Sequence, residues 1–151
     1  MPTATDNDTT TTIDIRKEIV IAASPEIAFE TILEELGPGS VMPDGKPFPM
    51  KIEPWPGGRW YRDLGEDNGH LWGFVQSIKR PGLLEIWGPL FMSSGATSHL
   101  IYRLSETPEG SLIKFTHTVV GPFPDDYRSG LTMGWTALLA RVRKAAESAA
   151  R

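Results

Sequence analysis

The sequence predicts an α+β domain in which a curved, seven-stranded antiparallel sheet surrounds one long C-terminal helix. Strand-like segments follow one another through short turns, and this order favours antiparallel neighbours because parallel strands need long crossovers. From Pro124 to Ala149, in contrast, apolar residues recur every three or four positions and no proline interrupts the segment. A helix of that length must run across the sheet rather than cover one corner of it.

The chain length and the amino-acid composition are those of one compact domain. The chain has 151 residues, which fits a single domain. Residues 1–12 are polar and low in complexity, so we expect a flexible tail there and one folded domain over residues 13–151. The chain contains no cysteine, which excludes disulfide bonds, thiolate metal sites and a cysteine nucleophile.

Charge and hydropathy limit the partners that we expect. The formal net charge is −4, and the basic residues are scattered apart from Arg141, Arg143 and Lys144. A nucleic-acid-binding surface normally carries a basic patch or stripe. No apolar run is long enough to span a bilayer, and the N-terminus lacks the features of a signal peptide. We therefore expect a cytoplasmic protein with neither a nucleic-acid nor a membrane partner.

The elements before the last helix are predicted from local patterns. Ile13 to Ala22 alternates between apolar and polar residues, which indicates a half-buried strand. Ser24 suits a helix N-cap, Pro25 suits the first turn, and Gly37-Pro38 ends that helix. Further strands are predicted at 50–53, 59–64, 71–79, 83–87, 98–104 and 112–120, with a tight turn at Asp67-Asn68-Gly69.

The segment 88–95 interrupts the run of strands and carries Leu90, Phe91 and Met92. An apolar loop at this place could either close the mouth of a cavity or pack on the core. The last helix has an apolar stripe, and Asp125 and Asp126 near its start suit the helix dipole. The residues of this stripe are Leu131, Trp135, Leu138, Val142, Ala145 and Ala149.

Three stretches of the chain resemble a known family. They are Pro56-Gly57-Gly58-Arg59-Trp60, the run from Gly73 to Pro81 with Leu84 and Trp87, and Gly134-Trp135 with Leu138, Val142 and Glu147. With the order of elements, they make the chain similar to the activator-of-heat-shock-protein-90-ATPase-like branch of the START-related helix-grip superfamily. The resemblance implies a helix-grip fold with a cavity between sheet and helix. It also implies that Gly134-Trp135 is a packing motif.

The predicted function is the binding of a small apolar or aromatic molecule in that cavity. Aromatic side chains dominate apolar sites, and Trp and Tyr can also donate a hydrogen bond. We expect the ligand contacts to come from Trp72, Phe74, Tyr102, Phe115, His117, Met133 and Trp135. The faces on which Arg59, Tyr61 and Arg62 lie stay open, and an inward Arg62 would be a candidate for an anionic group of the ligand.

The histidines are the remaining candidates for chemistry. Strand alternation places His117 on the inner face and His99 on the outer face, so the two cannot share a metal ion. We expect no metal and no cofactor, since zinc needs more ligands than the chain offers together. A buried His117 needs a hydrogen-bond partner, either from the protein and water or from a ligand.

Two other functions remain open. A cyclase- or hydrolase-type enzyme would need a buried polar pair in the cavity, and the sequence offers only His117 with unassigned neighbours. A co-chaperone-like domain would act through its surface, with a chaperone or a second copy of the chain as its partner. The fold alone does not choose among these functions.

Overall fold

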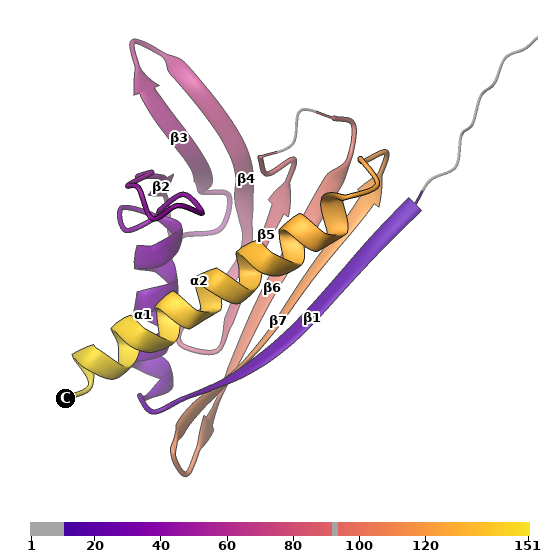
Figure 1. Cartoon of the computed structure of the whole chain (residues 1–151). Helices are drawn as coiled ribbons and strands as arrows, with labels where there is room; N and C mark the ends of the chain where they lie inside the picture. Colours follow the sequence, from indigo (N-terminus) through magenta and orange to yellow (C-terminus); the bar gives the residue numbers. More distant parts are fainter. Residues whose placement is uncertain (1–10, 92–93) are drawn as a thin grey trace, which may run out of the picture.

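A computed structural model describes residues 11–91 and 94–151 of the chain (Figure 1). The order of elements is the predicted one, and most strands are longer at their ends than the sequence pattern indicated. In chain order the elements are β1 (Thr11–Ile21), α1 (Pro25–Leu36), β2 (Lys51–Ile52), β3 (Arg59–Gly65), β4 (Asn68–Lys79), β5 (Leu83–Gly88), β6 (Thr97–Thr107), β7 (Gly110–Gly121) and α2 (Tyr127–Ala149).

The strands form one seven-stranded sheet in the order β1-β7-β6-β5-β4-β3-β2. Every neighbouring pair is antiparallel. The helix α2 crosses one face of this sheet, and α1 packs beside α2 at one end (Figure 1). The predicted antiparallel sheet around a long C-terminal helix is therefore confirmed.

The first strand begins earlier than the composition indicated. Thr11 and Thr12 belong to β1 and pair with Gly121 and Val120 of β7. The boundary of the predicted tail at residue 12 is therefore wrong by two residues, because pairing with β7 orders a polar segment that could not order itself. The rest of that tail, residues 1–10, lies outside the described residues.

The helix α1 begins as its sequence indicates. The side chain of Ser24 accepts a hydrogen bond from the backbone N–H of Ile27 at 3.3 Å, and Pro25 occupies the first turn. This cap satisfies one of the N–H groups that a helix leaves without a partner. The apolar face that it presents to the core consists of Ala28, Phe29, Ile32, Leu33 and Leu36.

The turn between β3 and β4 lies earlier than predicted. Gly65 pairs with Asn68, so Glu66 and Asp67 form the two-residue turn, both with positive φ (54° and 64°). Two central residues with positive φ match the strand twist in tight hairpins. The predicted turn at Asp67-Asn68-Gly69 was wrong by one or two positions, since β4 begins at Asn68.

The helix α2 begins at Tyr127 rather than at Pro124, so both Asp125 and Asp126 precede its first turn. Most of the predicted stripe is buried against the sheet, but Ala145 and Ala149 are exposed. After Val142 the next buried residue is Ala146, four positions on, rather than Ala145, three positions on, since one turn of an α-helix holds 3.6 residues. The buried residues of α2 are Leu131, Trp135, Leu138, Leu139, Val142 and Ala146.

The Gly57-Gly58 turn ahead of β3 allows a testable prediction. A Cβ atom on Gly58 would overlap the backbone carbonyl oxygen of Glu53. Because that oxygen belongs to the backbone, Gly58→Ala must shift the chain, and we expect it to destabilise the protein by about 1–3 kcal/mol in urea unfolding. Gly95→Ala is the control, because its Cβ would make only ordinary contacts with Pro122. Equal stability of the two variants would contradict the close approach at Gly58.

Candidate functional site

A pocket of about 340 Å³ lies between α2, the end of α1, the following loop, and strands β3 and β4. Its wall is mostly apolar and rich in aromatic rings. The lining residues are Glu35, Leu36, Ser40, Val41, Met42, Pro43, Phe48, Trp60, Trp72, Phe91, Gly130, Leu131, Gly134, Trp135, Leu138 and Arg141.

Four aromatic side chains form one wall of the pocket. The ring of Trp72 lies at its centre, with centroid distances of 5.1 Å to Trp60, 5.5 Å to Phe91 and 6.0 Å to Phe48. The indole N–H of Trp60 donates to the carbonyl oxygen of Leu36 at 2.8 Å. This bond fixes the orientation of the Trp60 ring and provides a partner for a carbonyl oxygen at the end of α1. The wall is therefore held by edge-to-face contacts of Trp72 with Trp60 and Phe91, by a tilted contact with Phe48, and by one buried hydrogen bond.

A β-bulge brings Trp72 to this wall. Trp60 pairs with Gly73 and Tyr61 pairs with Leu71, so Trp72 has no partner on β3. An extra residue of this kind re-aims a side chain. Trp72 and Phe74 are both predicted ligand contacts, but the structure places them on different faces of the sheet. Phe74 instead lies on the other face, where its ring packs at 5.6 Å from the half-exposed Trp87.

Two exposed glycines of α2, Gly130 and Gly134, lie at the rim of the pocket. A Cβ atom on Gly130 or on Gly134 would meet no atom within 4 Å. The interpretation of Gly134-Trp135 as a packing motif is thus wrong for its glycine, because no neighbour approaches Gly134 closely enough to require it. Both glycines line the pocket and are exposed to solvent.

A buried chain of hydrogen bonds runs from α2 into the sheet. The indole N–H of Trp135 donates to Nδ1 of His117 at 2.8 Å, and Nε2 of His117 lies 2.8 Å from the hydroxyl of Ser98. An indole can only donate, so Nδ1 must be the unprotonated nitrogen and Nε2 carries the proton. Burial, with a smaller contribution from His99, lowers the pKa of His117 from 6.5 to about 4. The imidazole is therefore neutral at pH 7.

This arrangement corrects two expectations about His117. Both ring nitrogens are used by protein side chains and the residue is fully buried, so it offers no hydrogen bond to a ligand. The pair with Ser98 also has the wrong tautomer for nucleophilic catalysis, because Nε2 donates to the hydroxyl instead of accepting its proton. Neither Ser98 nor His117 lines the pocket.

Three other predicted contact residues lie away from the pocket. Phe115 and Tyr102 are core residues, with their rings 4.8 Å apart and Phe115 packed under Trp135 at 4.8 Å. Burial raises the pKa of the Tyr102 hydroxyl. Met133 is 73% exposed, since it lies on the opposite side of α2 from the buried Leu131 and Trp135. Of the seven predicted contacts, the structure brings Trp72 and Trp135 to the pocket.

The sequence left open whether the segment between β5 and β6 packs on the core or borders a cavity, and its residues do both. Leu90 is buried in the core, while Phe91 lines the pocket and is 47% exposed. Met42, also exposed, lines the pocket from the loop after α1. The pocket therefore opens to solvent near these two side chains. Met92 lies outside the described residues.

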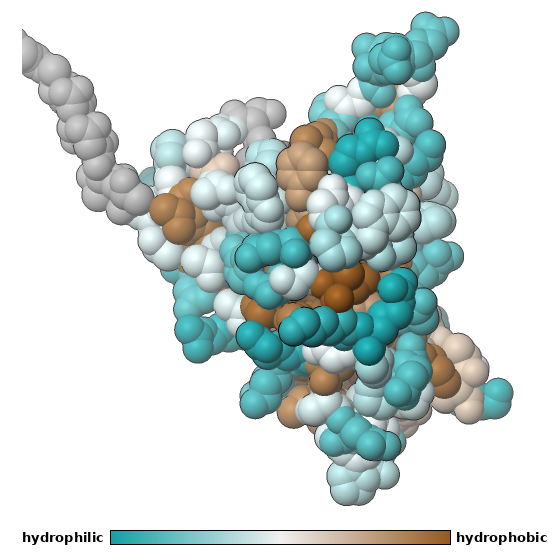
Figure 2. All heavy atoms as spheres, turned by 180° about the vertical axis from the view of Figure 1, so that it is seen from behind, coloured by the Kyte–Doolittle hydropathy of each residue, from teal (hydrophilic) through white to brown (hydrophobic). Residues whose placement is uncertain are grey.

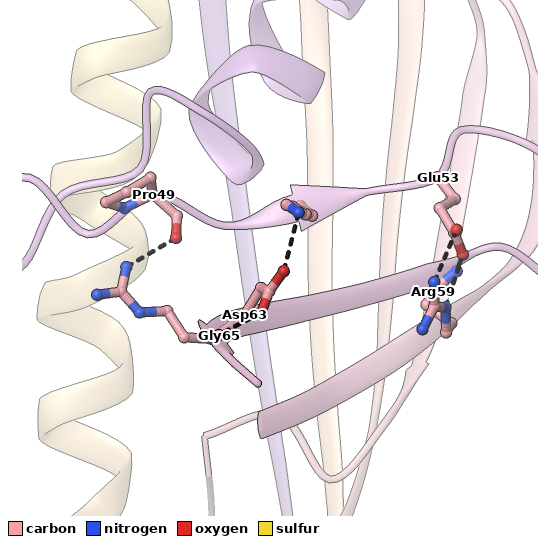
Figure 3. Close-up of polar contacts among 7 residues, drawn as sticks. Pro49, Glu53, Arg59, Asp63 and Gly65 are labelled. Atoms are coloured by element: carbon pink, nitrogen blue, oxygen red, sulfur yellow. Dashed lines mark hydrogen bonds and ion pairs between the residues drawn. The ribbon is translucent and has the colours of Figure 1, made fainter. Parts of the chain in front are cut away.

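The structure shows on which face of the sheet the two arginines of β3 lie. Arg59 points outward, where it forms an ion pair with Glu53 at 3.0 Å that lowers the pKa of this carboxyl to about 2. Arg62 lies on the face of Trp60 and donates to the carbonyl oxygen of Pro49 at 2.7 Å, a contact drawn in Figure 3. Its guanidinium also stacks on the ring of Phe48 at 4.0 Å. Tyr61 lies under Arg59 at 4.3 Å.

The pocket contains residues that sequence analysis did not single out. Phe48 and Met42 come from a loop whose conformation has no simple pattern, and Gly130 looks like an ordinary break in an apolar stripe. An ion pair between Glu35 of α1 and Arg141 of α2 lies at the pocket edge, with a distance of 3.2 Å. Two glycines one turn apart in a long helix were the signal that could have indicated the pocket.

Two further hollows lie at the β3–β4 hairpin and between α1 and the end of α2, and neither has a tryptophan in its lining. Seen from behind, the molecule is largely hydrophilic, with apolar patches between polar side chains (Figure 2). His99 lies on the outer face, as strand alternation predicted, and contacts Glu85 at 2.9 Å. Within residues 11–91 and 94–151, no group of three or more His, Asp or Glu residues could hold a metal ion. None of the helices in this part of the chain could cross a membrane.

Comparison with known proteins gives matches among solved structures alone. The chain matches no protein-family model and none of the curated proteins. It is similar to a protein of unknown function from Staphylococcus aureus, with a TM-score of 0.69 and 12% identity over 95% of this chain and 98% of the other.

Two further solved structures share the fold over most of the chain. Ara h 8.0201 matches with a TM-score of 0.66 and 12% identity, over 91% of this chain and 99% of its own. The Aha1 dimer from Colwellia psychrerythraea matches with a TM-score of 0.64 and 16% identity, over 89% and 96%. At these identities the likeness extends to the fold, and the chain therefore has the helix-grip fold.

Proposed function

We propose that the chain binds a small apolar or aromatic molecule in the pocket between α2 and the aromatic wall. The observation that carries this proposal is the apolar lining of a pocket of about 340 Å³, which includes Trp60, Trp72 and Trp135. Gly130 and Gly134 are exposed at the rim of the pocket and carry no side chain, so neither narrows its opening.

The composition of the lining supports binding rather than catalysis. Its polar side chains are Ser40, Glu35 and Arg141, and the last two form an ion pair. The one buried serine–histidine pair, Ser98 with His117, lies outside the lining and has the unsuitable tautomer. An apolar pocket with few polar groups is typical of a ligand-binding site.

The test is a titration with the neutral fluorescent probe N-phenyl-1-naphthylamine. We expect saturable binding to the wild type and at least about tenfold weaker binding to Gly134→Phe, whose ring would occupy the pocket. Met133→Phe is the matched control, since it adds the same ring one position away on the exposed side of α2. Gly134→Ala should retain binding and raise stability by about 1 kcal/mol. Unchanged binding by Gly134→Phe would contradict the proposal.

We also propose that the chain belongs to the activator-of-heat-shock-protein-90-ATPase-like branch of this fold and acts in the cytoplasm. The motifs around Gly58, Gly73 and Gly134 support the branch, and the Aha1 structure has the same fold. A co-chaperone-like function would leave the pocket empty. In that case the probe titration would show no saturable binding, whereas a partner ATPase or a second copy would bind.

A further inference from the structure

We infer that the ligand of this pocket carries a carboxylate or a similar anionic group, which binds the guanidinium of Arg141. This inference rests on the proposed function and adds the chemical class of the ligand and its orientation. The apolar body would lie against Trp72 and Trp135, with the anionic end toward α1.

The charged end of the pocket consists of two residues. Glu35 and Arg141 are the charged side chains in the lining, and Nε of Arg141 contacts Oε1 of Glu35 at 3.2 Å. The side chain of Arg141 is 34% exposed, against 14% for Glu35. An incoming ligand therefore meets the guanidinium more readily than the carboxylate.

The guanidinium keeps unused donors. Within the part of the chain that the structure describes, its one hydrogen bond runs from Nε to Glu35, so the N–H groups of both terminal nitrogens have no protein partner. Arginine presents five N–H donors in a planar fork that matches a carboxylate. The ion pair with Glu35 thus holds the fork in place while leaving its outer edge for a second anion.

The surroundings favour an anion over a cation. The guanidinium of Arg62 packs 4.0 Å from the centre of the Phe48 ring, which adds a second positive charge beside the lining. Three of the carbonyl oxygens at the end of α1, which would attract a cation, are already hydrogen-bonded. That of Leu36 accepts from Trp60, and those of Leu33 and Glu34 accept from Gly37.

The spacing along α2 sets the length of the ligand. Arg141 lies eleven residues beyond Gly130, which corresponds to about 16 Å of helix at 1.5 Å per residue. Gly134 and Leu138 lie between them and also line the pocket. A body of about two fused rings would fit beside the glycines while its acidic group reaches Arg141.

The test uses three probes with the same body: 2-naphthoate, 2-naphthamide and 2-naphthylmethylammonium. Isothermal titration calorimetry should show that wild type binds 2-naphthoate about tenfold more tightly than the neutral amide, and the cation most weakly. Arg141→Gln should weaken 2-naphthoate binding about tenfold and leave 2-naphthamide within about twofold. Glu35→Gln should strengthen 2-naphthoate binding about threefold, because it removes a negative charge while the amide oxygen can still accept from Nε of Arg141.

Lys144→Gln is the matched control, because it removes the same charge from an exposed position of α2 outside the lining. Its affinities should equal those of the wild type, and thermal unfolding verifies that all variants fold. Equal affinity of the wild type for 2-naphthoate and 2-naphthamide, or tighter binding of the cation, would overturn the anionic ligand and leave the pocket as a binding site. If Gly134→Phe also binds all three probes as the wild type does, the proposed function itself is wrong.

Discussion

Replacing Trp135 by alanine should destabilise the protein by about 4 kcal/mol, the largest loss that we expect from a single side chain. Trp135 is 7% exposed and packs on Phe115, and truncation of a buried tryptophan costs about 3–5 kcal/mol. The change also removes the donor to Nδ1 of His117 and leaves that nitrogen buried without its partner. Chemical unfolding in urea measures the loss.

Two variants separate packing from hydrogen bonding in this effect. Trp135→Phe keeps most of the ring but lacks the indole N–H, so we expect it to cost about 1–3 kcal/mol. Trp87→Ala is the control for a tryptophan that is half exposed on the outer face, and it should cost about 1 kcal/mol or less. A loss below about 1 kcal/mol for Trp135→Ala would mean that α2 does not hold the sheet through this residue.

Lowering the pH from about 6.5 to about 4 should remove roughly 3 kcal/mol of stability through His117 alone. In the unfolded chain this histidine binds a proton near pH 6.5, whereas burial in the folded protein delays protonation until about pH 4. Between these values the unfolded state holds more protons, so acid favours unfolding. The contribution of His117 is complete above pH 6.5 and is lost as the pH falls toward 4.

Other groups also titrate in acid, so the measurement compares two proteins. The free energy of unfolding of the wild type and of His117→Gln is measured from pH 7.5 to pH 4. The variant is less stable at neutral pH because the bonds to Trp135 and Ser98 change, but the difference from wild type should shrink as the pH falls. Parallel profiles for the two proteins would show that His117 is not buried as a neutral imidazole.

The fold could be predicted because its signals are local. Alternation along β1 and β7 and the helical stripe from Leu131 to Val142 each depend on a few neighbouring residues, and the structure confirms them. The turn at Glu66-Asp67 was missed because Asn68-Gly69 is the stronger local signal, although pairing of Gly65 with Asn68 decides the register. The ends of several strands were also missed, because pairing with a neighbouring strand, rather than the local sequence, decides where a strand ends.

The candidate site was predicted less well because its geometry depends on contacts between distant segments. Trp72 reaches the pocket through a bulge that only the pairing with β3 creates, while Phe74, two residues on, turns outward. His117 was correctly placed inside, but its partners come from β6 and α2. Sequence alternation identified the buried face and could not show which of its residues border empty space.

The indole N–H signals of the five tryptophans provide the most direct test of the pocket as a ligand site. Trp60, Trp72 and Trp135 line the pocket, while Trp55 and Trp87 do not and are about half exposed. In a ¹H–¹⁵N NMR titration with 2-naphthamide, we expect saturable shifts of the first three signals and unchanged positions for the other two. Shifts confined to Trp55 and Trp87, or no saturable shift at all, would contradict ligand binding between α2 and the aromatic wall.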